Sequence, residues 1–151
     1  MASGEDMAKR WMAHRRVTLD LLDRIPDDRA SFKPWPDAMT CAQLAAHIGG
    51  SHHMFATLAA GLPFERPDPA TLPADLPGVR DLLRRLTEED EATLNGLTAD
   101  DMRREVTMRA GAMPANDALA MAREHEVHHK GQLFEYARIC GVESVPGWIR
   151  P

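Results

Sequence analysis

The chain has 151 residues, a common size for one domain, so we expect a single domain over residues 1–151. Hydrophobic residues make up 44% of the sequence and can form a core, whereas aromatic residues make up only 5%. Because aromatic and β-branched side chains favour strands, this composition predicts helices and argues against an all-β sandwich or a large parallel sheet. The net charge of −5 argues against nucleic acid as a partner, since proteins that bind phosphate backbones carry a basic surface.

The sequence also lacks the patterns of membrane and disulfide-rich proteins. No apolar run reaches the roughly 18 to 20 residues that span a bilayer, and acidic residues occupy the N-terminal stretch where a signal peptide would be apolar. We therefore expect a cytoplasmic protein that does not enter a membrane. Cys41 and Cys140 are too few for a disulfide scaffold, and we expect both to remain thiols.

Four segments show apolar residues at helical spacing, and capping residues mark where the first two begin. The first helix is predicted over about residues 5–25, after a capping box formed by Ser3 and Asp6. The second is predicted over about residues 41–60, after a capping box that opens with Thr40.

Prolines and a glycine mark the other two predicted helices. Pro77 suits the first turn of a third helix over about residues 77–95. Pro114 begins a fourth helix over about residues 114–140, which Gly141 ends.

The links between these helices define the topology. Four prolines lie between Gly61 and Pro77, and they predict an extended segment that travels the length of a bundle. Residues 97–113 are predicted as an irregular link in which Arg104 to Met108 form a short extended piece. The prediction is an all-α fold, a four-helix bundle with a long crossover between the second and third helices.

Histidines are concentrated on the second and fourth predicted helices. His125 and His129 lie four residues apart, so both project from one side of the fourth helix, on the face that we predict to be buried. Two buried imidazoles without partners cost about 1 to 3 kcal/mol each, and a divalent metal ion would satisfy them. The register of the second helix points His47 inward as well.

Three imidazoles with an open fourth position are typical of a catalytic zinc site, and nickel or ferrous iron would also accept them. The alternative is a set of core or interface histidines held by hydrogen bonds without a metal. His125, Glu126 and His129 also match the HExxH pattern of zinc proteases, in which Glu126 would be the general base beside a metal-bound water. A small helical bundle has no strand edge to hold an extended peptide, so we do not favour a protease.

Two segments, TCAQLAAHIGGSHHMF and AREHEVHHKGQLFEYARICG, resemble the signature segments of the DinB/YfiT-like superfamily, which is distinct from the DNA polymerase of similar name. The second segment has the family's histidine, two free positions, a histidine pair, a basic residue and Gly-Gln. Helix order, the long second link and total length agree, so the resemblance covers nearly the whole chain. It implies a four-helix bundle, a homodimer, and one divalent metal ion held by His47, His125 and His129.

The resemblance also implies two kinds of chemistry. Several members use the metal to bind a low-molecular-weight thiol as thiolate, and others are regarded as metal-dependent hydrolases. The leading hypothesis is therefore a metal-dependent enzyme of thiol transfer, detoxification or hydrolysis, with a thiol or another small molecule as its partner. A second hypothesis is a stress-associated dimeric bundle whose metal is structural, and a third is a metal-free bundle.

Other polar side chains of the two signature segments receive secondary expectations. We expect His52 and His53 at the surface or at an interface. His128 points about 100° away from the adjacent ligand and is expected beside the ligands or on a dimer surface. Gln132 is expected to bond to the site or to face the partner helix, and Tyr136 to pack with its hydroxyl toward a pocket.

Overall fold

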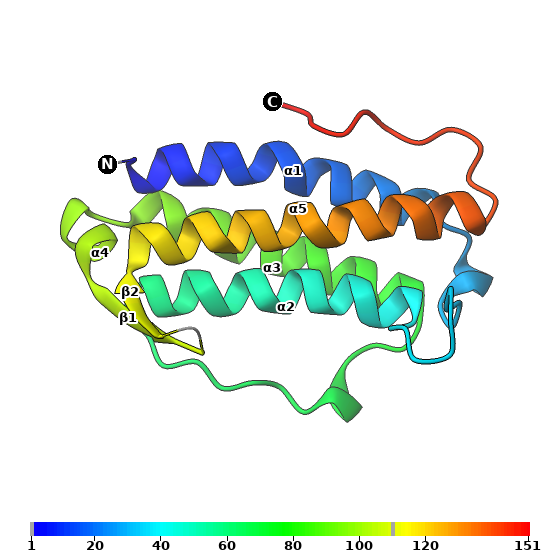
Figure 1. Ribbon diagram of the computed structural model, residues 1–151, viewed down its shortest axis with the longest axis horizontal. Coiled ribbons are helices and arrows are strands. Elements are labelled where there is room, and N and C mark those ends of the chain that lie inside the picture. Colours follow the sequence, from blue (N-terminus) through cyan, green and yellow to red (C-terminus); the bar gives the residue numbers. More distant parts are fainter. Residues whose placement is uncertain (1, 110) are drawn as a thin grey trace.

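The computed structural model describes residues 2–109 and 111–151. Four long helices pack into a bundle, which confirms the predicted fold class (Figure 1). They are α1 (Gly4–Arg24), α2 (Cys41–Ala59), α3 (Leu76–Gly96) and α5 (Ala115–Ile139). These bounds lie within two residues of the predicted ones.

Local capping explains where the first two helices begin. The Ser3 hydroxyl accepts a hydrogen bond from the Asp6 backbone N–H, and the Asp6 carboxylate accepts one from the Ser3 N–H. Thr40 and Gln43 form the same reciprocal pair before α2. Each box satisfies two backbone donors that the first turn of a helix leaves free.

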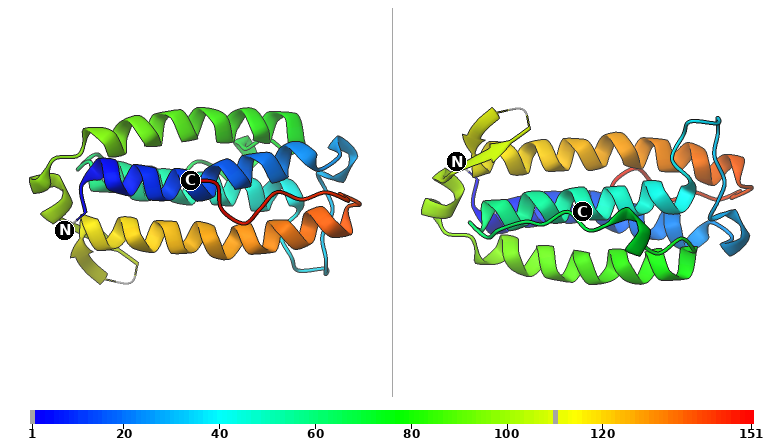
Figure 2. Two further views of the ribbon diagram at one scale, coloured as in Figure 1. Left: turned by 90° about the horizontal axis from the view of Figure 1, so that it is seen from above. Right: turned by 90° about the horizontal axis from the view of Figure 1, so that it is seen from below.

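The long crossover sets the direction of the helices. It leaves α2 at the left of Figure 1, returns along the outer side of α2 and α3, and enters α3 at the right (Figures 1 and 2). A single turn of 3-10 helix, Pro69–Thr71, lies within it. Helices α2 and α3 are therefore parallel neighbours, and α5 packs antiparallel beside α2.

The region after α3 is more regular than predicted. It contains a short helix, α4 (Ala99–Arg103), and an antiparallel pair of strands, β1 (Glu105–Met108) and β2 (Gly111–Pro114). The predicted extended piece corresponds to β1, whereas α4 and β2 were missed. Thr98 begins α4 with another capping box, a signal that the sequence contains.

The core of the bundle has two apolar clusters along its length. One lies toward the start of α2 and includes Leu21, Leu44, Leu83 and Leu133; the other lies toward the hairpin and is centred on Trp11. Both cysteines are free and buried, and burial raises the pKa of the Cys41 thiol to about 12. Within the described residues, no helix has the length and apolar character needed to cross a bilayer.

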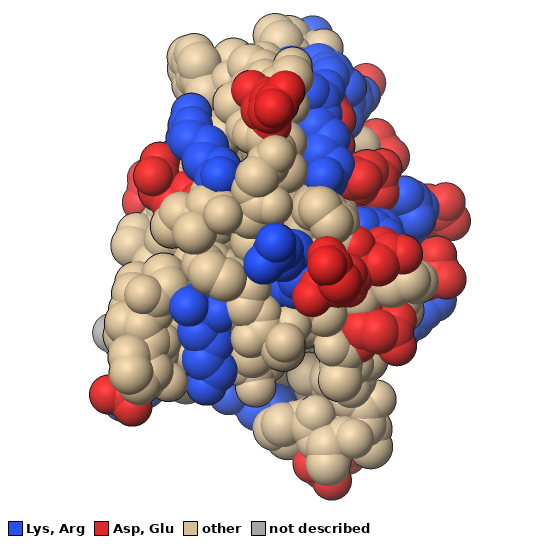
Figure 3. Space-filling view, turned by 90° about the vertical axis from the view of Figure 1, so that its right-hand side faces the viewer, with Lys and Arg blue, Asp and Glu red and all other residues tan. Residues whose placement is uncertain are grey.

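Charged side chains of both signs are mixed at the end of the bundle where α2 and α3 begin (Figure 3). Arg80 of α3 donates to the carbonyls of Leu22 and Ile25 at the end of α1 and pairs with Asp27 of a 3-10 turn, Asp27–Arg29. The guanidinium thereby satisfies carbonyl groups that the last turn of a helix leaves free.

Candidate metal centre

Three histidines converge where α2 and α5 pack side by side. Nε2 of His47 lies 3.1 Å from Nε2 of His125 and 3.1 Å from Nε2 of His129. Nitrogen ligands at about 2.0 to 2.1 Å from a tetrahedral ion lie about 3.3 Å from one another. The observed spacing therefore fits three ligands of a single ion.

Among the described residues, no further histidine, cysteine or carboxylate joins the set. In the described part of the chain, the group of histidine, cysteine and carboxylate ligands within reach of one ion consists of His47, His125 and His129. Three neutral nitrogens leave a coordination position for an exchangeable molecule, as in catalytic zinc sites. The donor set also suits nickel or ferrous iron.

Gln132 fixes the protonation pattern of one ligand. Its side-chain oxygen lies 2.6 Å from Nδ1 of His129, where it accepts the ring N–H. The proton of the neutral ring therefore sits on Nδ1, and Nε2 keeps the lone pair that a metal needs. The predicted bond from Gln132 to the site is present. The partner at His47 is weaker, because Ser51 Oγ lies 3.5 Å from its Nδ1.

The electrostatics of the cluster favour neutral imidazoles. Burial is the main cause that lowers the pKa of all three rings, and the neighbouring rings lower those of His47 and His125 further. The pKa of His125 falls to about 4. Neutral imidazole is the form that binds a metal ion.

His125 and His129 lie on the flank of α5 that faces α2, where they meet His47 of α2, and not in the core as predicted. The buried face of α5 is formed by other residues of this helix, among them Ala118, Ala122 and Leu133. His125 and His129 are half-buried and His47 is more exposed. The prediction failed because the buried face of α5 carries small alanines, a glutamate and a lysine in place of large apolar residues. The predicted apolar face was therefore shifted by one residue from the observed one.

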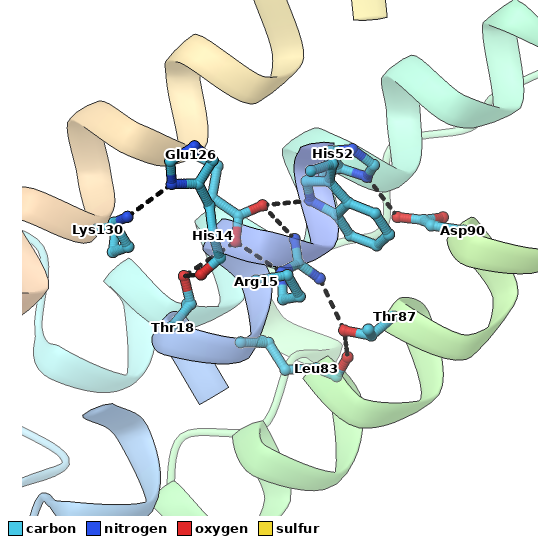
Figure 4. Close-up of polar contacts among 10 residues, drawn as sticks. His14, Arg15, Thr18, His52, Leu83, Thr87, Asp90, Glu126 and Lys130 are labelled. Carbon is cyan, nitrogen blue, oxygen red and sulfur yellow. Dashed lines mark hydrogen bonds and ion pairs between the residues drawn. The ribbon is translucent and has the colours of Figure 1, made fainter. Parts of the chain in front are cut away.

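Glu126 lies in that core instead of beside a metal-bound water. Its side chain is fully buried, and its carboxylate accepts hydrogen bonds from Trp11 at 2.6 Å, Thr18 at 2.9 Å and Arg15 at 2.7 and 2.9 Å (Figure 4). A general base needs access to the proton it removes. This placement does not fit the predicted catalytic role of Glu126 and indicates a structural one.

The buried ion pair continues into α3. Arg15 also donates to the Thr87 hydroxyl at 2.9 Å, and Thr87 donates to the Leu83 carbonyl (Figure 4). Burial raises the pKa of Glu126, but the charge and hydrogen bonds of Arg15 outweigh it and leave the pKa below its ordinary value. The carboxylate is therefore ionised and paired, which a charge without solvent requires.

His52 and His53 share one buried carboxylate; the predicted surface or interface placement is wrong for His52, whereas the His53 side chain is 32% exposed. His52 is 2% exposed, and its Nδ1 lies 2.9 Å from Oδ2 of Asp90. Nδ1 of His53 lies 2.7 Å from the other oxygen of Asp90. The contact crosses from α2 to α3, so no local pattern in the sequence could reveal it.

The remaining candidates have simple placements. His128 is exposed beside His129 and outside the ligand set. The Tyr136 hydroxyl donates to the Met39 carbonyl at 2.9 Å, so it serves a backbone contact. Lys130 is buried and donates to His14 Nδ1 at 2.8 Å and to the Trp148 carbonyl, which holds the C-terminal segment against the bundle.

A groove adjoins His47, one of the three histidines. It has a volume of about 630 Å³ and lies between α2, the loop before α2 and the crossover. His47 lines it together with Arg66, whose charge also lowers the pKa of His47. Met39, Met54 and Leu72 supply apolar walls. A small molecule in this groove would contact the ring of one candidate ligand.

The fold and this site define a class: a four-helix bundle with a solvent-accessible three-histidine site that can bind a metal ion. The sequence matches the DinB superfamily over residues 10–133. It is also 32% identical to the Bacillus subtilis protein YjoA over 152 residues, which cover 97% of this chain and 96% of YjoA. The chain therefore belongs to the DinB superfamily, as its two signature segments indicate.

Solved structures agree with this assignment. The crystal structure of the DinB-like protein YjoA from Bacillus subtilis has a TM-score of 0.83 at 30% identity and covers 95% of this chain and 97% of that one. A DinB-like protein from Bacillus cereus has a TM-score of 0.79 at 24% identity, with 95% of both chains covered. YfiT from Bacillus subtilis is described as a probable metal-dependent hydrolase with an unusual four-helix bundle topology. It has a TM-score of 0.69 at 23% identity, and the match covers 93% of this chain and 91% of YfiT.

Proposed function

We propose that this protein is a metal-dependent enzyme that activates a small nucleophile, a thiol or a water molecule, for transfer or hydrolysis. One divalent ion, zinc, nickel or iron, is held by His47, His125 and His129. The single observation that carries the proposal is that His47, one member of this three-nitrogen set, lines a groove that a small molecule can enter.

A bound ion would supply Lewis acidity, which lowers the pKa of bound water or thiol toward neutrality. The residues of the chain have separate tasks. Gln132 holds the Nδ1 proton of His129 and keeps the ring in place. Arg66 places a positive charge in the groove, where it attracts an anionic group of the substrate.

Thiol transfer is the leading reaction, and it would serve the detoxification of electrophiles. The groove has room for a low-molecular-weight thiol, whose carboxylate Arg66 can bind while the apolar walls contact the electrophile. Hydrolysis uses the same site with water in place of the thiol. The description of YfiT as a probable metal-dependent hydrolase supports this second reaction.

The test is a pair of assays on zinc-loaded protein, conjugation of glutathione to monochlorobimane and hydrolysis of p-nitrophenyl acetate. We expect turnover in one assay, loss of that turnover in His129→Ala, and its retention in His128→Ala. His128 is the matched control, because it is the neighbouring histidine of the same helix and lies outside the ligand set.

Binding is tested separately with cobalt-loaded protein, because a thiolate on cobalt gives a strong ultraviolet absorption band. Glutathione should produce this band, and His129→Ala should not show it. Failure of both assays together with no thiolate band would contradict the proposed function.

The alternative is a structural metal in a dimeric, stress-associated bundle. The observation that favours a structural metal is that the three histidines come from two helices, α2 and α5. An ion bound to them would hold these helices together. In that case, His129→Ala should lower the melting temperature of the metal-loaded protein, and neither assay should show turnover above the level of free metal.

A further inference from the structure

A second cavity lies beside the groove that His47 lines, and residues of α2 and of the crossover line both. It has a volume of about 750 Å³, and α3 supplies the rest of its lining. Its lining includes His53 from α2 and Arg85 from α3. Neither residue takes part in the proposed metal chemistry.

His53 presents one edge to this cavity. Its Nδ1 is hydrogen-bonded to Asp90, which is 1% exposed, whereas the His53 side chain is 32% exposed. Because the Nδ1 edge faces the buried carboxylate, the opposite edge, which carries Nε2, is the one that reaches the cavity. A ring that donates Nδ1–H to a carboxylate has a fixed orientation, as in many binding and catalytic sites.

The carboxylate that holds His53 has a second partner in the core. The second oxygen of Asp90 is bound by His52, and His52 stacks on Trp11 with ring centroids 3.9 Å apart. Hydrogen bonding to Asp90 raises the pKa of His53, and the charges of Asp90 and Glu89 add to this, against burial and the charge of Arg85. The protonated ring can donate Nε2–H to a ligand.

Arg85 adds a second donor from α3. Its only partner among the described residues is Glu89 at 3.1 Å, and both side chains are largely exposed, so this pair is weak. Phe64 and Leu86 supply apolar surface in the same cavity. Glu65 and Asp81 also line it, so its overall charge does not favour polyanions.

We propose that His53 and Arg85 bind the carboxylate of a small organic acid whose apolar body fills the cavity beneath the crossover. Two donors from adjacent helices suit the two oxygens of one carboxylate. None of the three metal ligands lines this cavity, although the cavity and the groove share six lining residues: Ala46, Gly50, Phe64, Pro67, Leu72 and Pro73.

The probe is benzoate, with benzamide as its neutral counterpart, and binding is followed by the NMR signals of the His53 ring. We expect benzoate to shift these signals and benzamide to leave them unchanged. Calorimetry should show benzoate affinity weakened about tenfold in His53→Gln and in Arg85→Gln, as expected for losing a charge-assisted bond. If His53→Gln destabilises the fold, Arg85→Gln still tests the proposal, because Arg85 is exposed and its replacement should leave the fold intact.

Two controls isolate the site. Arg84→Gln changes the preceding arginine of α3, which lies outside the cavity lining and pairs with Asp23, and should leave affinity unchanged. His129→Ala should also leave it unchanged, so failure of the metal hypothesis would not affect this result. Equal binding of benzamide, or unchanged benzoate affinity in Arg85→Gln, would overturn the proposal.

Discussion

Trp11 and His52 stack almost in parallel, with 8° between their ring planes, and each ring donates to a different buried carboxylate. Trp11 donates to Glu126 on α5, and His52 donates to Asp90 on α3. A continuous buried polar layer thus joins all four long helices. Such layers stabilise a fold only when every member is paired, so their loss is costly.

Glu126→Gln should destabilise the protein by about 3 to 5 kcal/mol, because the buried guanidinium of Arg15 would lose its counter-charge. Chemical denaturation measures this change. The matched control is Glu89→Gln, which removes a surface ion pair and should change stability by less than about 1 kcal/mol. Unchanged stability together with lost turnover would instead support the catalytic role that the HExxH pattern suggests.

The contribution of His53 to stability should depend on pH. Its pKa is raised in the folded state by Asp90, so the stabilisation is complete below the ordinary value of about 6.5 and is lost as pH rises through the raised pKa. The melting temperature of His53→Gln should therefore fall further below that of the parent at pH 5.5 than at pH 8.5. The same difference at both pH values would show that the fold does not raise the pKa of the ring.

Gln132→Leu should weaken metal binding about 10- to 100-fold, because the acceptor that fixes the Nδ1 proton of His129 is removed. Competition with a chromogenic chelator measures the affinity. Gln132→Glu keeps an acceptor oxygen and should retain most of it. An unchanged affinity in Gln132→Leu would mean that the bond does not orient the ligand.

Two adjacent glycines of α2 should respond differently to alanine. A Cβ atom at Gly50 meets nothing within 4 Å, so Gly50→Ala should stabilise the helix by about 0.5 to 1 kcal/mol. A Cβ atom at Gly49 would lie 3.0 Å from Leu83 Cδ1, so Gly49→Ala should be less stable than Gly50→Ala. Equal gains in the denaturation midpoint would contradict the close packing of α2 on α3.

Local signals in the sequence predicted the helices well. Capping boxes at Ser3 and Thr40, and prolines at the other two starts, act within one turn and need no tertiary information. The four-residue spacing of His125 and His129 is also a local signal, because it places both side chains on one side of a helix. His47 was placed by helix register and family resemblance, and the structure brings it to the other two.

Contacts between helices were the part that local patterns could not predict. Asp90 lies 37 and 38 residues from the two histidines it binds, and Glu126 lies 111 residues from Arg15. Charged residues on a helix usually mark its solvated face. Because Glu126 and Lys130 are charged but buried, the buried face of α5 was predicted in the wrong place. Ala118, Ala122 and Glu126 follow one another at four-residue spacing. This spacing was the signal in the sequence that could have placed Glu126 on the buried face.

The proposed function requires that His47, His125 and His129 bind one metal ion. The most direct measurement is metal content by mass spectrometry on untagged protein purified without chelator, with the His47→Ala, His129→Ala and His128→Ala variants beside it. We expect close to one divalent ion per chain in the parent and in His128→Ala, and its loss in the other two variants. A parent protein without metal that also fails to take up zinc, nickel or iron would contradict it.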